Sequence, residues 1–176
     1  MLEAVSSFFL VVRNYTKKGY IRFGFSVDWI FSLLKITKQM LRHENEVLVA
    51  TEEKRVVGTI SYMVDNYALP IEALFPEELK EIRASSARIA YIGSFATIAS
   101  KHCTRVALLL LRELEKRSYA IGITCAICVV HPAHAHFYTR YGFRVVKEQK
   151  TMSGLSENAA AVLLVKDNVQ TNCFCK

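Results

Sequence analysis

Hydrophobic and polar positions follow two rhythms along the chain, and together they predict a domain that mixes helices and strands. Short runs of β-branched and other apolar residues predict strands at 47–50, 56–64, 87–98, 123–130, 143–150 and 159–166. Apolar residues at helical spacing predict helices at 28–43 and 105–117. Pro76, which is followed by acidic residues, predicts the start of another helix. Residues 8–16 fit either a first strand or a buried turn of helix.

Length and composition fit a single domain over 1–176, because 176 residues of which 52% are hydrophobic can form one substantial core. Residues 66–86 form an insert within this domain, and residues 168–176 form a polar C-terminal tail. The apolar run at 8–12 is too short for a signal sequence or a membrane span. We therefore expect a cytoplasmic protein with no membrane span, whose cysteines are reduced.

Cys125 and Cys128 have the spacing of a metal or redox pair, and His131 and His134 continue that spacing. The segment around the two cysteines is apolar and β-branched, which predicts a buried strand. Residues three apart on a strand point to opposite faces, so the pair cannot share one tetrahedral ion without a bend. We therefore expect no metal site. Two further cysteines in the tail are expected to be exposed and idle: Cys173 and Cys175.

The net charge of +7 is compatible with nucleic acid, an acidic membrane or an acidic protein as partner, although many basic domains are simply soluble. The sequence contains no glycine-arginine tract, zinc finger or recognition-helix pattern. We therefore expect no nucleic-acid partner.

A short helix is predicted directly after the strand at 123–130. Pro132 suits its first position, where a missing N–H costs nothing, and Gly142 suits the left-handed residue after its last turn. The sequence F-Y-x-x-x-G-F at 137–143 resembles the C-terminal motif of the GNAT (N-acetyltransferase) superfamily. In that superfamily the tyrosine at the place of Tyr138 lies near the thioester sulfur and can protonate the departing thiolate. The resemblance implies an α/β (α+β) fold, with a mixed, mostly antiparallel sheet whose central parallel pair splays around a donor cleft, flanked by helices.

Further segments resemble one branch of this superfamily, the long-chain N-acyl amino acid synthases. The likeness covers roughly 45–146, and its most specific element is H-P-x-H-A-x-F-Y at 131–138. Those synthases take a fatty acyl group from acyl carrier protein and place it on the amine of an amino acid. Acyl-homoserine-lactone synthases are a more distant version of the same arrangement. Tyr91 and Ser94 stand where the synthases commonly have glutamate and arginine, which leaves the acyl acceptor open.

The resemblance also implies a donor site. Backbone groups of one strand would hold the pantetheine arm at Phe95, Ala96, Thr97 and Ile98. The loop and helix start that follow would receive phosphate at Lys101, His102, Thr104 and Arg105. The loop lacks the usual glycines, so it suits the single phosphodiester of acyl carrier protein better than the pyrophosphate of coenzyme A. The next helix has a basic face that either is merely solvated or docks an acidic carrier protein: Arg105, Arg112 and Lys116.

Aminolysis of a thioester needs a neutral amine, a polarised carbonyl and a proton for the leaving thiolate. Tyr138 is the candidate acid, unless it only packs its helix. His131 is the candidate base, unless it only caps the helix after it. Asp65 and Glu72 are further options for the base. His134 lies one turn before Tyr138 and either tunes the phenol by hydrogen bonding or sits at the surface. The insert is expected to cap the acceptor side, and its apolar residues either line a pocket or belong to the core: Leu69, Leu74, Phe75, Leu79 and Ile82.

The sequence therefore predicts a GNAT-fold N-acyltransferase. Its donor would be an acyl thioester, with acyl carrier protein favoured, and its acceptor a primary amine such as an amino acid. The alternatives are an acetyl-coenzyme A-dependent N-acetyltransferase and a non-catalytic module that binds acyl or pantetheine groups.

Overall fold

A six-stranded mixed sheet forms the centre of the computed structural model, which describes residues 2–17, 45–66, 69, 71–100, 102–149 and 160–167. The strands are β1 (Asn45–Glu52), β2 (Arg55–Val64), β3 (Ile89–Thr97), β4 (Cys125–Val130), β5 (Arg144–Gln149) and β6 (Ala161–Asp167). Their order is β1-β2-β3-β4-β6-β5, in which β3 and β4 are parallel and every other neighbouring pair is antiparallel. The described helices are α1 (Leu2–Lys17), α3 (Pro76–Ser85), α4 (Cys103–Ala120) and α5 (Pro132–Arg140).

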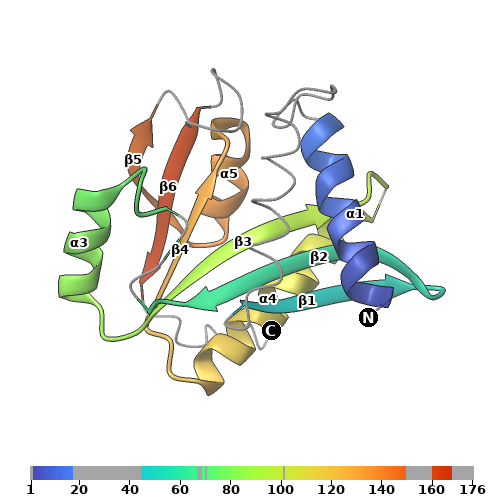
Figure 1. Ribbon diagram of the computed structural model, residues 1–176, viewed down its shortest axis with the longest axis horizontal. Coiled ribbons are helices and arrows are strands. Elements are labelled where there is room, and N and C mark those ends of the chain that lie inside the picture. The colour runs from blue at the N-terminus through green and yellow to red at the C-terminus, as the bar shows by residue number, and fades with distance from the viewer. Residues whose placement is uncertain are drawn as a thin grey trace.

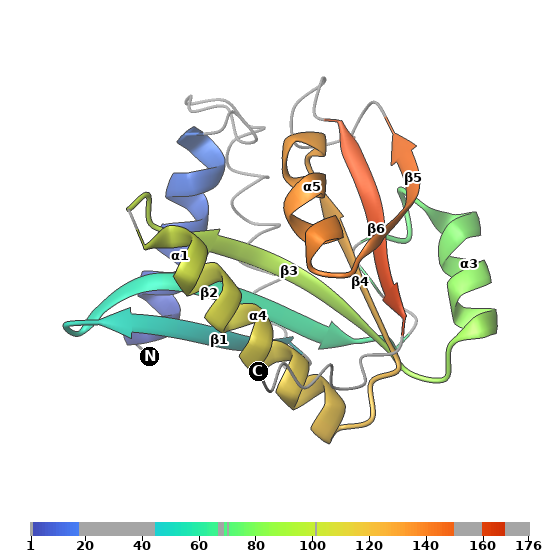
Figure 2. The same cartoon turned by 180° about the vertical axis from the view of Figure 1, so that it is seen from behind.

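The helices cover both faces of the sheet. One face carries α4 and α5 and the other carries α1 and α3, as the two opposite views show (Figure 1, Figure 2). Successive side chains of a strand point to opposite faces, so β3 contributes to two cores. Ala90 and Ile92 belong to the buried cluster on the α4/α5 face. Ile89 and Tyr91 belong to a cluster on the α1/α3 face.

The first apolar segment forms a helix. Residues 8–16 lie within α1, so the alternative of a first strand is wrong. The side of α1 that packs on the sheet carries Ser7, Leu10 and Val11, all buried and at helical spacing. Phe9, 63% exposed on the outer side, adds an apolar residue that blurs this spacing in the sequence. The predicted helix at 28–43 and the tail at 168–176, with its two cysteines, lie outside the described residues.

The remaining predicted elements are confirmed with shifted ends. The hairpin of β1 and β2 turns through Glu53 and Lys54, which have left-handed φ angles of 47° and 64°, as a tight hairpin turn requires. The long helix extends by two or three residues beyond each predicted end, to Cys103–Ala120. Cys125 and Cys128 lie on β4 and join clusters on opposite faces, as predicted. None of the described helices has both the length and the apolar character that a membrane crossing needs.

The insert packs as core. Leu69, Phe75, Leu79 and Ile82 are at most 6% exposed and join the cluster on the α1/α3 face, with Leu74 half-buried against it. This packing supports the core interpretation of these side chains over the pocket interpretation.

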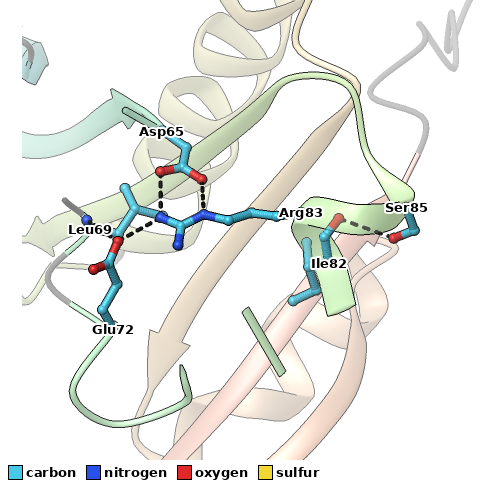
Figure 3. Close-up of polar contacts among 6 residues, drawn as sticks. All are labelled: Asp65, Leu69, Glu72, Ile82, Arg83 and Ser85. Atoms are coloured by element: carbon cyan, nitrogen blue, oxygen red, sulfur yellow. Dashed lines mark hydrogen bonds and ion pairs between the residues drawn. The ribbon is translucent and has the colours of Figure 1, made fainter. Parts of the chain in front are cut away.

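A cluster of ion pairs fastens the insert to the end of β2 (Figure 3). Arg83 donates to both carboxylate oxygens of Asp65, at 2.6 and 2.7 Å, and to Glu72 Oε1 at 2.5 Å. Glu72 Oε1 also accepts from the Leu69 amide at 3.1 Å. Hydrogen bonding to Asp65 is the main cause that raises the pKa of Arg83. The Asp65 amide bonds to the carbonyl of Ile89, where β3 begins, so both carboxylates serve the fold at the end of β3 remote from Phe95.

Candidate active site

The parallel strands β3 and β4 separate part-way along their length. Their pairing runs from Ile89 with Cys125 to Ile92 with Cys128. Beyond that point β3 continues to Thr97 and β4 to Val130, and the two strands diverge (Figure 1). The facing edges therefore present backbone N–H and C=O groups that the ladder between these strands does not use. Such an edge can bind an extended arm by backbone hydrogen bonds.

A β-bulge lies where the strands separate. Gly93 pairs with Ser61 and Ala96 with Thr59, so Ser94 and Phe95 together oppose a single residue of β2. Ser94 has a left-handed φ of 49°. The extra residue changes the alternation of side chains along β3. Phe95 now packs on the same face as Ile92, whereas strict alternation from Ile92 would put it on the opposite face.

The bulge brings Phe95 against Tyr138 of α5. The two ring centroids are 6.2 Å apart, in an edge-to-face arrangement. Tyr138 also packs on Phe137 and Phe143, with centroids 5.4 and 5.6 Å away, and is 6% exposed. The structure thus places the candidate acid beside the point where β3 and β4 part.

The local sequence determines where α5 begins and ends. His131 is the N-cap: its Nδ1 accepts from the Ala133 amide at 3.2 Å, and Pro132 follows at the first helical position. Gly142, with φ of 92°, ends the helix. The cap interpretation of His131 is therefore confirmed. Because Nδ1 is the acceptor, a neutral His131 has its proton on Nε2. The proposed role of His131 as a base stays a prediction, and His134 lies beside it with ring centroids 6.3 Å apart.

We call the edge of β3 that faces β4 beyond Ile92 the open edge. Some backbone groups near the end of β3 are already hydrogen-bonded. The Ile98 amide donates to the Val57 carbonyl of β2 at 2.9 Å, so it does not face the open edge. Because N–H groups alternate along a strand, those of Phe95 and Thr97 point the other way. The Thr97 carbonyl accepts from Asn14 Nδ2 at 2.8 Å. Asn14 was missed in the sequence, although its spacing from Ser7, at i and i+7, puts both on the same side of α1.

The start of α4 keeps the features of an anion site. His102 is its N-cap, without a side-chain capping bond, and the first turn carries no acidic residue, which leaves the positive end of the helix dipole unopposed. Thr104 and Arg105 are exposed in that turn, and Lys101 lies outside the described residues. Gly58 lets α4 lie close to β2, since a Cβ there would be only 2.6 Å from Val106 Cγ1.

The solvent side of α4 mixes charge with apolar area. The cations Arg105, Arg112 and Lys116 are exposed, as predicted for one face. Leu108, Leu109 and Tyr119 lie among them and are 39%, 53% and 53% exposed. We call these six residues the α4 stripe. A cavity of about 340 Å³ between β1 and α4 shares Leu109 with the stripe, but its other lining residues include none of the predicted site residues.

Comparisons with known proteins identify the family of this chain and solved structures with the same fold. A family model described as N-acyl amino acid synthase FeeM matches residues 6–167. Among solved structures, FeeM from uncultured soil microbes superposes with a TM-score of 0.74 at 19% identity, over 92% of this chain and 83% of its own. A GNAT-family acetyltransferase from Staphylococcus aureus Mu50 gives 0.62 at 13% identity, over 95% and 94%. Among curated proteins, none matches by sequence.

An aminoglycoside 6'-N-acetyltransferase complexed with coenzyme A is also similar, with a TM-score of 0.60 at 12% identity over 93% of this chain and 89% of its own. At such identities the solved structures establish the GNAT fold. The family model adds the family, because it spans most of the chain. The chain therefore belongs to the N-acyl amino acid synthase FeeM family and is a GNAT-fold acyltransferase.

Proposed function

We propose that the protein takes an acyl group from the phosphopantetheine of an acyl carrier protein and transfers it to the amine of an amino acid. The observation that carries this proposal is the separation of β3 from β4 beside Tyr138. The open edge of β3 suits an extended pantetheine arm, and the buried phenol lies where the thioester of such an arm would end. Membership of the synthase family supports the amino acid as acceptor.

Different groups of the site would polarise the carbonyl, protonate the leaving thiolate and deprotonate the amine. The amine nitrogen attacks the thioester carbonyl, whose oxygen is polarised by an amide of the open edge at Phe95 or Thr97. The carbon–sulfur bond then breaks and Tyr138 gives its proton to the leaving thiolate. The amine loses its proton, directly or through water, to the imidazole of His131 at Nδ1, the nitrogen with a lone pair, once its bond to the Ala133 amide opens, and the imidazolium then gives a proton to solvent. Tyr138 regains a proton from solvent before the next turnover.

The α4 stripe and the start of α4 support the carrier protein as donor. A first turn without acidic residues and without the usual glycines suits one phosphodiester. The cations of the stripe would attract an acidic partner, and its exposed Leu108, Leu109 and Tyr119 offer apolar contact area. Coenzyme A is the alternative donor, since the similar aminoglycoside enzyme was solved with it.

A donor screen tests the proposal directly. The protein is incubated with a mixture of amino acids and either acyl carrier protein or coenzyme A that carries the same acyl group, and the products are identified by mass spectrometry. We expect N-acyl amino acids, formed faster from the carrier protein. Faster transfer of acetyl groups from coenzyme A would instead establish an N-acetyltransferase. Thioester binding without transfer from either donor would establish a binding module.

Charge reversal on α4 tests the docking surface. Arg112→Glu with Lys116→Glu should raise the KM for acyl carrier protein at low salt, because an acidic partner then meets like charge. The KM for a small acyl-pantetheine should change little. Lys80→Glu with Arg88→Glu makes the same change of net charge at exposed positions away from α4 and is the matched control. Equal effects of the two pairs, or a salt-independent KM, would show that the stripe is only a solvated helix face.

A further inference from the structure

One polar cluster ties three elements together on the α4/α5 face. Lys166 Nζ of β6 donates to Glu115 Oε1 of α4 at 2.5 Å, and the Tyr141 hydroxyl, just after α5, donates to Glu115 Oε2 at 3.1 Å. The ammonium of Lys166 also lies 4.5 Å from the centre of the Tyr141 ring, a cation–π contact. The side chains of Lys166 and Glu115 are only 15% and 21% exposed. We call Glu115, Tyr141 and Lys166 the clamp.

The clamp is joined to the candidate acid through the backbone that ends α5. The amides of Tyr141 and Phe143 both donate to the carbonyl of Tyr138, at 2.9 and 3.1 Å. The Phe143 ring also packs on the Tyr138 ring, with centroids 5.6 Å apart. Tyr138 thus contacts the segment 141–143 through its backbone and its side chain. A shift of Tyr141 would therefore carry Tyr138 with it.

The other side of the clamp belongs to elements that are fixed independently of α5. Glu115 lies on α4, the helix whose first turn is the candidate anion site. Lys166 pairs with Ala126 in the ladder between β4 and β6. Separating two largely buried opposite charges is costly, so the ion pair gives the Glu115 carboxylate a fixed place. Burial raises the pKa of Tyr141, which keeps its hydroxyl protonated and able to donate.

We infer that Glu115 and Tyr141 are positioning residues, which fix the place of the Tyr138 hydroxyl relative to the bound donor. The inference rests on the proposed acyl transfer, in which Tyr138 is the acid. One helix would then align both partners of the proton transfer: the first turn of α4 holds the donor phosphate, and Glu115 on the same helix sets the place of α5. An acid must lie within hydrogen-bond reach of the atom that it protonates. A misplacement of about 1 Å can cost about 100-fold in rate.

A double-mutant cycle with Tyr138 tests this role. Tyr141→Phe removes one hydroxyl and keeps the ring beside Lys166. We expect kcat with the donor that the protein uses best to fall on the order of 10-fold or more, while the Kd for that donor stays unchanged. In a Tyr138→Phe background the same substitution should cause no further loss, because the hydroxyl that it positions is gone. Glu115→Ala breaks the same contact and should give the same pattern.

Tyr62→Phe is the matched control. Tyr62 also donates its hydroxyl to a carboxylate, that of Glu46, and belongs to the buried cluster on the same face. Its kcat should equal that of the unaltered protein. An unchanged kcat in the folded Tyr141→Phe variant overturns the inference. An equal loss in the Tyr138→Phe background also overturns it, because the clamp would then be only a brace. If urea unfolding shows that Glu115→Ala is not folded, Tyr141→Phe decides alone.

A spectroscopic signature tests the clamp without turnover. In protein labelled with fluorotyrosine, the fluorine NMR signal of Tyr138 is the one that Tyr138→Phe removes. We expect this signal to shift or broaden in Tyr141→Phe and Glu115→Ala, because the end of α5 is released, and to stay in place in Tyr62→Phe.

Failure of the inference and failure of the proposed function are distinguishable. If the unaltered protein transfers no acyl group from any donor, the proposed function fails and the NMR signal decides the clamp by itself: an unchanged signal in the variants overturns it. If the protein transfers acyl groups, the kinetic cycle decides. Additive losses, or no loss at all, then leave the proposed function standing without the clamp.

Discussion

At the scale of single residues, one substitution at the buried Tyr138 can remove its hydroxyl and keep the packing of its ring. Tyr138→Phe keeps a ring that contacts three others and removes the hydroxyl that would be the proton source. We expect turnover to fall on the order of 100-fold or more, as for the loss of a general acid, while donor affinity stays unchanged. Kinetics with a rate-limiting chemical step and direct donor binding measure both. Turnover equal to that of the unaltered protein would remove Tyr138 from the mechanism.

At the same scale, His131 has one observed role, as the cap of α5, and one proposed role, as the base. Its Nδ1 caps α5, so His131→Ala should lower the free energy of unfolding by about 1 kcal/mol, and His131→Asn, whose side chain can also cap, should restore it. If the imidazole is the base as well, both variants should lose the acidic limb of the kcat/KM profile against pH. Urea unfolding and the pH profile measure the two roles. A profile in His131→Asn that keeps its shape and only moves down in amplitude would leave the cap as the residue's role.

At the scale of elements, the approach of α4 to β2 depends on Gly58. An added Cβ would lie 2.6 Å from Val106 Cγ1 and 2.9 Å from Leu110 Cδ1, so Gly58→Ala must push α4 outward. We expect a loss of about 1–3 kcal/mol in stability and a higher KM for the donor, because the start of α4 moves away from β3. Urea unfolding and donor titration measure these effects.

Gly122→Ala is the control for Gly58→Ala. Gly122 has a left-handed φ of 76° and open space around it, so alanine there costs backbone strain of about 1 kcal/mol without moving α4. Its donor KM should equal that of the unaltered protein. A parallel rise of KM in both variants would mean that lost stability, and not the position of α4, weakens donor binding.

At the scale of the whole molecule, buried groups make stability depend on alkaline pH. Burial raises the pKa of Cys125 from 9.0 to about 11 and that of Tyr62 from 10.0 to about 12. Below the unfolded values both groups are neutral in either state, and their contribution to stability is complete. As pH rises through the unfolded and then the folded values, the unfolded chain releases its protons first, and the free energy of unfolding falls.

The slope should reach about 1.4 kcal/mol per pH unit for each group between its two pKa values. Urea unfolding from about pH 8 to about pH 11 measures the slope. Tyr62→Phe should remove the part of the slope that begins near the unfolded-state pKa of tyrosine, 10.0. A slope that is the same in both proteins would show that Tyr62 does not ionise late.

Burial also raises the pKa of Cys128, so alkylation of the native protein should label the half-buried Cys103 well before Cys125 and Cys128.

The elements that the sequence predicted correctly have patterns that a short window contains. Val106, Leu110 and Leu114 recur at helical spacing and pack inward from α4, and the alternation around Cys125 and Cys128 is complete within β4. Pro132 and Gly142 end α5 through backbone constraints of their own. Helix α1 has no such clear pattern, because Phe8 and Phe9 are adjacent and aromatic. Only packing on the sheet distinguishes its buried side from its exposed one.

From β1 onward, the sequence by itself therefore determined the order of strands and helices, the opposite faces of Cys125 and Cys128, and the position of Tyr138 on a short capped helix, because each depends on neighbours along the chain. Tertiary structure alone decided which strands separate, how the bulge at Ser94 turns Phe95 toward Tyr138, and that Asp65 and Glu72 serve Arg83. It also brought Glu115, Tyr141 and Lys166 together from three elements. Such contacts join residues far apart in sequence, where periodicity carries no information about which partners meet.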